Sequence, residues 1–120
     1  MKIAISAKGG KLDDDVDTRF GRAKMFIIYD SESKNTTSAS NLQNLNAAQG
    51  AGIQSAQNVI NAGVQMVFTG HCGPNAFKTL SAADIKVVLN ITGTVQDIIS
   101  LYESGQYKVS ESEDVEGHWV

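Results

Sequence analysis

The spacing of apolar residues changes near Ala48, and this change does most to restrict the possible folds. Five short segments are typical of strands, at residues 2–6, 25–29, 35–40, 65–69 and 85–89. The first three follow one another directly, whereas the last two alternate with segments of helical spacing. This order of elements predicts a layered α/β domain rather than an all-α or all-β one.

Three segments have the periodicity of amphipathic helices. The first spans residues 48–62 and ends at Gly63, the second begins near Pro74, and the third runs from Thr94 to Gly105. The first helix is expected to pack on the sheet through Ile53, Ala56, Val59 and Ile60. Thr94 and Asp97 have the spacing of a capping box at the start of the third helix.

The connections between these elements predict the sheet. Two hairpins place the first three strands side by side, with the second strand antiparallel to its neighbours. Right-handed crossovers through the first two helices then add the fourth and fifth strands. The result is a mixed five-stranded sheet of order 3-2-1-4-5, which reverses between strands 1 and 4. Open α/β sheets bind ligands beyond the carboxyl ends of strands at such a reversal.

The length of 120 residues suits one domain, predicted over residues 1–107, followed by an acidic tail over residues 108–120. The net charge of -3 gives no general attraction to nucleic acid. No segment has the pattern of a signal peptide or a membrane span. One cysteine cannot form an internal disulfide, so the sequence predicts a cytoplasmic protein.

Two loops are expected to meet where the strand order reverses. The first runs from Ala7 to Arg22 and ends in the sequence DTRFGR. There, Arg19 and Arg22 flank Phe20 and Gly21 and can clamp an anion with several donors. Arg19 alone would be a surface ion-pair partner, and Phe20 would equally serve as a core residue.

The second loop has the sequence GHCGPNA, from Gly70 to Ala76. Gly70 and Gly73 are expected to allow positive φ and close approach of a ligand. Pro74 suits the first turn of a helix, where amide N–H groups near Asn75 and Ala76 favour an anion. A purely structural strand-to-helix turn would use the same Gly-Pro pair.

Three side chains are candidate metal ligands: Cys72, His71 and, in the tail, His118. A helix N-terminus and nearby arginines would favour the Cys72 thiolate. The alternative for Cys72 is a small buried core residue, and the two readings are about equally supported. The aspartates between Asp13 and Asp17 lack the spacing of a calcium loop and are expected to be solvated.

Three longer stretches resemble one known family. They are DTRFGRAKMFIIYD, GAGIQSAQNVINAGVQMVFTGHCGPNAFKTL and ITGTVQDIISLYESGQY, and they cover nearly the whole chain up to Tyr107. Together they resemble the dinitrogenase iron–molybdenum cofactor biosynthesis family, which includes NifX, the C-terminal part of NifB and the orange-protein relatives.

The resemblance implies a ribonuclease H-like three-layer fold and a non-enzymatic role. The family binds, stores or carries iron–sulfur or molybdenum-containing sulfide clusters, with copper as a further candidate metal, in cofactor assembly or metal homeostasis. The family's arginine-rich loop corresponds to Arg19–Arg22, and its Gly-Pro loop to Gly73–Ala76. The expected partners are the cluster and a protein that donates or accepts it, with neither nucleic acid nor membrane.

The residues leave two other functions to weigh. A small redox or regulatory protein could use Cys72 as its reactive thiol, although no Asn or Asp partner for such a thiol is identifiable. A nucleotide- or phosphate-binding module would need a glycine-rich phosphate motif, and neither G-x-G-x-x-G nor the P-loop pattern is present. Nuclease chemistry is disfavoured because residues 2–6 and 65–69 carry no carboxylate.

Overall fold

The computed structural model describes residues 1–41 and 51–111 and shows one mixed sheet between two helical layers. The strands are β1 (Lys2–Ala7), β2 (Met25–Asp30), β3 (Thr36–Ser40), β4 (Met66–Phe68) and β5 (Lys86–Val88). The helices are α1 (Ala51–Asn61), α2 (Pro74–Ala82) and α3 (Val95–Ser104), with a 3-10 turn, η1, at Phe20–Arg22. The sheet order is β3-β2-β1-β4-β5, as predicted.

Strand pairing follows the predicted connections. β1 pairs antiparallel with β2, and β2 pairs antiparallel with β3. β4 is parallel both to β1 and to β5, because each crossover passes through a helix. The predicted α/β class and sheet order are therefore confirmed.

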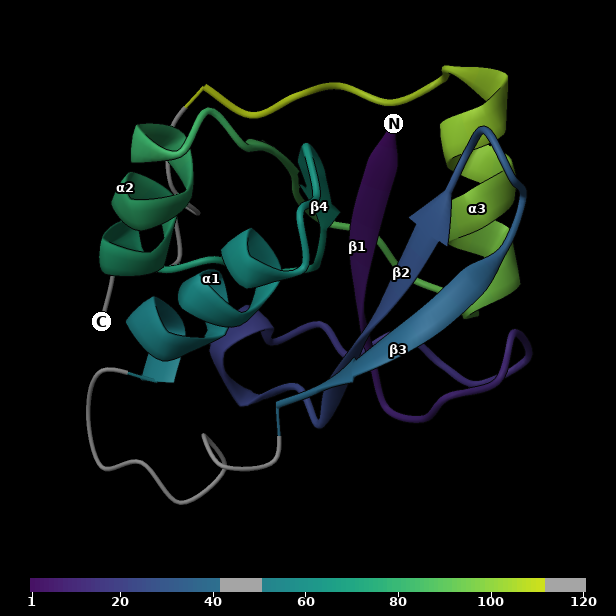
Figure 1. Ribbon diagram of the computed structural model, residues 1–120, viewed down its shortest axis with the longest axis horizontal. Coiled ribbons are helices and arrows are strands. Elements are labelled where there is room, and N and C mark those ends of the chain that lie inside the picture. The colour runs from purple at the N-terminus through teal and green to yellow at the C-terminus, as the bar shows by residue number, and fades with distance from the viewer. Residues whose placement is uncertain (42–50, 112–120) are drawn as a thin grey trace.

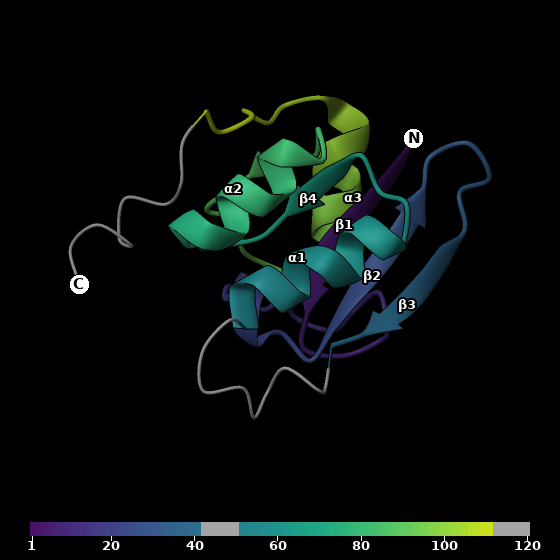
Figure 2. The same ribbon diagram turned by 60° about the vertical axis from the view of Figure 1, so that its left-hand side comes forward.

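The two faces of the sheet carry separate cores. Alternate residues of β1 show this, because Ala4 packs with α1 and α2 whereas Ile3 and Ile5 pack with α3. Figures 1 and 2 show α1 and α2 together on one face and α3 alone on the other. None of the helices in the described part of the chain is long and apolar enough to span a bilayer.

Local sequence signals set the ends of the helices. Thr94 and Asp97 form the predicted capping box at α3, and Gly105 ends that helix with a φ of 72°. Pro74 lies in the first turn of α2, after Gly73 at the N-cap. Gly63 follows α1 with a φ of 78°. The predicted start of the first helix at residues 48–50 lies outside the described residues.

The predicted inward face of α1 is partly wrong. Ala56 and Val59 are buried, but Ile53 is 41% exposed and the polar Ser55 is fully buried in its place. The physical reason is a set of hydrogen bonds between Ser55 and neighbouring polar groups, which satisfies the buried hydroxyl. The helix is consequently rotated so that Ile53 lies at the surface near the start of α1.

A polar contact ties the sheet to α3 and should make stability depend on pH. Hydrogen bonds from Tyr29 and Lys34 hold the pKa of Glu103 below its usual 4.5. A carboxylate with a lowered folded-state pKa stabilises the protein above its unfolded pKa, and this contribution is lost as the pH falls through the folded value. We expect Glu103→Gln to reduce the drop in urea midpoint between pH 7 and pH 3. An unchanged drop would contradict this role for Glu103.

Candidate functional site

The loops after β1 and β4 are joined by backbone hydrogen bonds. The amide of His71 donates to the carbonyl of Thr18 at 2.6 Å, and the amide of Phe20 donates to the carbonyl of His71 at 3.1 Å. Gly70 allows this contact, because a Cβ there would lie 2.6 Å from both Cβ and the carbonyl oxygen of Thr18. The strand order therefore brings the two predicted loops together.

A pocket of about 230 Å³ opens between η1 and the first turns of α1 and α2. Its lining consists of Phe20, Gly21, Gly52, Ile53, Gly73, Pro74, Asn75 and Ala76. We refer to these eight residues as the helix-end pocket. Its walls are close because glycine stands on both sides: a Cβ on Gly21 would lie 3.2 Å from the backbone of Gly52.

The start of α2 lines this pocket and carries backbone N–H groups with no acceptor in the described part of the chain. Gly73 occupies the N-cap and supplies no side-chain acceptor. Pro74 has no amide N–H, and within the described residues the N–H groups of Asn75 and Ala76 donate to no protein acceptor. The first N–H groups of a helix carry partial positive charge and attract anions. The pocket thus combines polar donors with apolar walls from Phe20 and Ile53.

The predicted arginines lie outside the lining of the helix-end pocket. Arg19 has a side chain that is 64% exposed, and its Nε lies 3.2 Å from Oδ1 of the buried Asp17. The second contact joins Nη2 of Arg19 to Oδ2 of Asp17 at 3.4 Å. This pairing offsets the charge of Arg19 but leaves the outer N–H groups of its guanidinium pointing away from the carboxylate. Arg22 ends η1.

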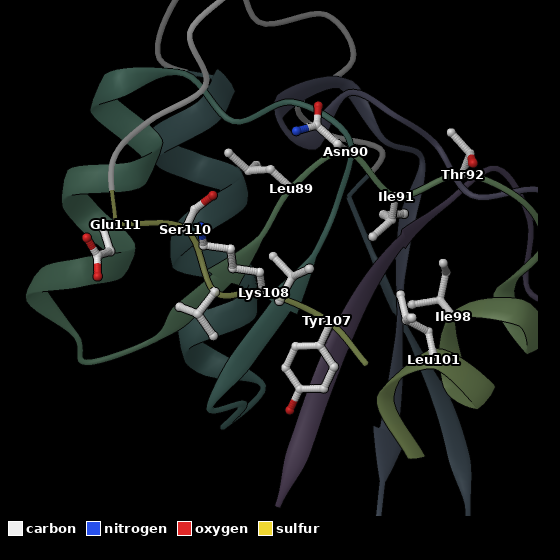
Figure 3. Close-up of a pocket in the computed structure, with 12 residues that line it drawn as sticks. Leu89, Asn90, Ile91, Thr92, Ile98, Leu101, Tyr107, Lys108, Ser110 and Glu111 are labelled. Carbon is white, nitrogen blue, oxygen red and sulfur yellow. The ribbon is translucent and has the colours of Figure 1, made fainter. Parts of the chain in front are cut away.

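A larger hollow of about 660 Å³ lies at the edge of the sheet, beside β5. We call it the β5 pocket, and its lining comes from Val88–Thr92, from α3 and from Tyr107–Glu111. Figure 3 shows Ile98 and Leu101 of α3 on one side of it, with Lys108 and Ser110 on the other. No predicted site residue in the described part of the chain lines this hollow.

The match to known proteins covers most of the chain. Residues 1–105 match the model of the family described as "Dinitrogenase iron-molybdenum cofactor". The chain belongs to this family. The match spans every helix and strand of the fold, and it assigns the protein a role in the handling of a metal-containing cofactor.

Solved structures of similar proteins share the fold. The apo form of the orange protein from Desulfovibrio gigas is 34% identical, covers 94% of this chain and 95% of its own, and has a TM-score of 0.91. A candidate NifB protein from Thermotoga is 37% identical, covers 90% of this chain and 91% of its own, and has a TM-score of 0.79. An uncharacterised protein from Methanocaldococcus jannaschii is 26% identical over 113 residues, 92% of each chain.

Within the described residues, the predicted ligands Cys72 and His71 do not belong to a group of three candidate metal ligands. Cys72 is 1% exposed and belongs to the core cluster that also contains Phe20 and Ala76. His71 is half-buried in the loop contact, and His118 lies outside the described residues. Among residues 1–41 and 51–111, no three His, Cys, Asp or Glu side chains are arranged to hold a metal ion.

Six predicted residues lie together in the helix-end pocket: Phe20, Gly21, Gly73, Pro74, Asn75 and Ala76. The expectation of positive φ at Gly70 and Gly73 is wrong. Gly73 has a φ of -67°, and Gly70 is not among the glycines with positive φ. Gly70 is required instead by its close contact with Thr18. Gly52 and Ile53 were missed, although a glycine in the first turn of a helical segment is a signal of close backbone approach.

Proposed function

We propose that this protein binds and carries an anionic metal–sulfur cluster, without catalysing its synthesis, and that the helix-end pocket is the binding site. The observation that carries the proposal is that Asn75 and Ala76, whose N–H groups have no protein acceptor in the described part of the chain, both line the helix-end pocket. Family membership supports a metal-containing cofactor as the ligand, and the N-terminus of a helix in the pocket favours a ligand with negative charge.

The chemistry of the lining favours a cluster that brings its own sulfides. The eight lining residues include no cysteine, histidine or carboxylate, so they offer hydrogen bonds and shape rather than metal–ligand bonds. Burial of a small, strongly hydrated anion in such a place is costly. A cluster whose charge is spread over several sulfur atoms costs less to desolvate, and its sulfides can accept the two amide hydrogen bonds. Molybdenum, copper and iron sulfides all fit this description.

Exposed Arg19 provides a further source of attraction in this proposal. Its paired guanidinium would offer outward N–H donors to an anion that approaches the strand ends, and a donor or acceptor protein would approach from the same side. Family membership is the basis on which we propose a role in cofactor assembly or metal homeostasis.

Anaerobic reconstitution tests the proposal. Protein is mixed with tetrathiomolybdate and copper(I), or with iron and sulfide, desalted, and examined by visible absorption and metal analysis. We expect charge-transfer absorption and bound metal after desalting in at least one mixture, and neither with molybdate, whose oxygens are strongly hydrated. Protein that stays colourless and metal-free in every mixture would contradict the proposal.

A substitution of Cys72 tests whether this candidate ligand binds the metal. A thiol buried in apolar surroundings is usually inert, which also disfavours the redox alternative. We therefore expect Cys72→Ala to retain the absorption spectrum and metal content of the reconstituted protein. A loss of absorption in a variant that remains folded by circular dichroism would show that Cys72 ligates the metal.

A further inference from the structure

A buried polar network lies behind the helix-end pocket. At its centre is Asn41, which follows β3 and is 0% exposed. Its side-chain amide Nδ2 donates to the carbonyl of Ala23 at 2.8 Å and to Oγ of Ser55 at 3.0 Å. Its Oδ1 accepts from Nδ2 of Asn58 at 2.6 Å. A buried amide with several partners fixes the groups around it, because each lost bond would leave a polar atom unsatisfied.

The network joins the two walls of the pocket that come from different parts of the chain. Ser55 and Asn58 belong to α1, whose first turn supplies Gly52 and Ile53 to the lining. On the other side, Oγ of Ser55 lies 3.4 Å from the carbonyl of Gly21 in η1. The backbone amide of Asn41 also donates to the carbonyl of Lys24, just beyond η1, at 2.9 Å.

The spacing of these walls leaves little room for adjustment. Gly21 and Gly52 face each other so closely that a Cβ on Gly21 would lie 3.2 Å from both N and Cα of Gly52. A further contact holds the third wall, since a Cβ on Gly52 would lie 3.2 Å from Cβ of Ala76 in α2. A small shift of η1 against α1 would therefore alter the width of the pocket.

We propose that Asn41 and Ser55 are positioning residues for cluster binding: they hold η1 against α1 and so set the width of the helix-end pocket. This inference rests on the proposed function of that pocket. Neither residue lines the pocket, and both act through the backbone carbonyls of Gly21 and Ala23. Groups that orient a binding site from behind are often as important to affinity as the groups that touch the ligand.

Ser55→Ala is the most informative variant. Asn41→Ala would remove a buried amide, leave its hydrogen-bond partners unsatisfied and risk global unfolding. Ser55→Ala removes only one hydroxyl from a helix. Alanine has the higher helix propensity, by about 0.5 kcal/mol, which offsets part of the lost hydrogen bonding. The matched control is Ser100→Ala, the same change at an exposed position of α3 on the opposite face of the sheet.

Two measurements are made on each variant. The first is the dissociation constant for tetrathiomolybdate with copper(I), measured by visible titration. We expect it to rise about tenfold in Ser55→Ala, as for the loss of a supporting group behind a metal site, and to stay unchanged in Ser100→Ala. The second is the backbone amide NMR spectrum of the apo protein. The amide signals of Gly21 and Gly52 should shift in Ser55→Ala and remain unchanged in Ser100→Ala.

The outcomes separate this inference from the proposed function. Wild-type affinity in Ser55→Ala overturns the positioning role while the proposed function stands. Equal weakening in Ser55→Ala and Ser100→Ala also overturns it, because the effect would then be unrelated to the network. Failure of the wild-type protein to bind a cluster from any of the reconstitution mixtures overturns the proposed function, and the positioning role fails with it.

Discussion

Gly73→Asp is expected to weaken cluster binding strongly while it slightly stabilises the fold. Gly73 is the N-cap of α2, with a φ of -67° and a ψ of 169°, and a Cβ there would meet nothing within 4 Å. An aspartate in this conformation can accept hydrogen bonds from the N–H groups that the cluster would use. Such a cap raises the free energy of unfolding by about 0.3 kcal/mol.

The loss of binding follows from competition and charge. Two amide donors at about 0.5–1.5 kcal/mol each correspond to a complex that is weaker by roughly fivefold to 150-fold, and the added carboxylate repels an anion further. Gly73→Ala is the control, because it adds a Cβ but neither an acceptor nor a charge. Visible titration gives affinity and urea unfolding gives stability. Undiminished binding in folded Gly73→Asp would remove the start of α2 from the site.

Gly70→Ala is expected to have the largest effect on stability. Its Cβ would lie 2.6 Å from Cβ and the carbonyl oxygen of Thr18. The loop cannot easily move away, because the amide of His71 donates to Thr18 at 2.6 Å and the amide of Asn90 donates to Gly70 at 2.9 Å. Overpacking of this kind costs about 3 kcal/mol, and it should separate the two loops of the site.

Urea unfolding of Gly70→Ala measures this cost against the wild-type protein. Gly73→Ala again serves as the control, since both variants exchange glycine for alanine in the same loop but only Gly70 faces a close neighbour. We expect Gly73→Ala to lose at most about 1 kcal/mol, the cost of a poorer N-cap, and therefore clearly less than Gly70→Ala. Equal stability of the two variants would show that the contact between Gly70 and Thr18 is not tight in solution.

Much of the fold follows from signals that lie close together in the sequence. The capping box of Thr94 and Asp97, the helix end at Gly63 and the helix start at Pro74 each depend on a few neighbouring residues. The sheet order then follows from the connections, and it places the loops before Arg22 and after Thr69 side by side. The residues of the Gly-Pro turn could therefore be predicted to share a candidate site with the loop that ends at Arg22.

The back wall of the site could not be predicted in the same way. Ser55 and Asn41 are polar, and their burial depends on hydrogen-bond partners up to 34 residues away in the sequence. That burial also rotates α1 and brings Ile53 to the pocket, against the apolar periodicity of the helix. Hydrogen bonds between distant parts of the chain determine which of these side chains are buried, and the local sequence pattern does not predict such bonds.

Backbone amide spectra during a titration with tetrathiomolybdate, a diamagnetic anion, test the central claim most directly. The account predicts that the largest shifts fall on the helix-end pocket, above all on the amides of Asn75 and Ala76, while residues 88–92 and 107–111 of the β5 pocket stay unchanged. Saturable shifts confined to the β5 pocket, or an absence of shifts at Asn75 and Ala76, would contradict it.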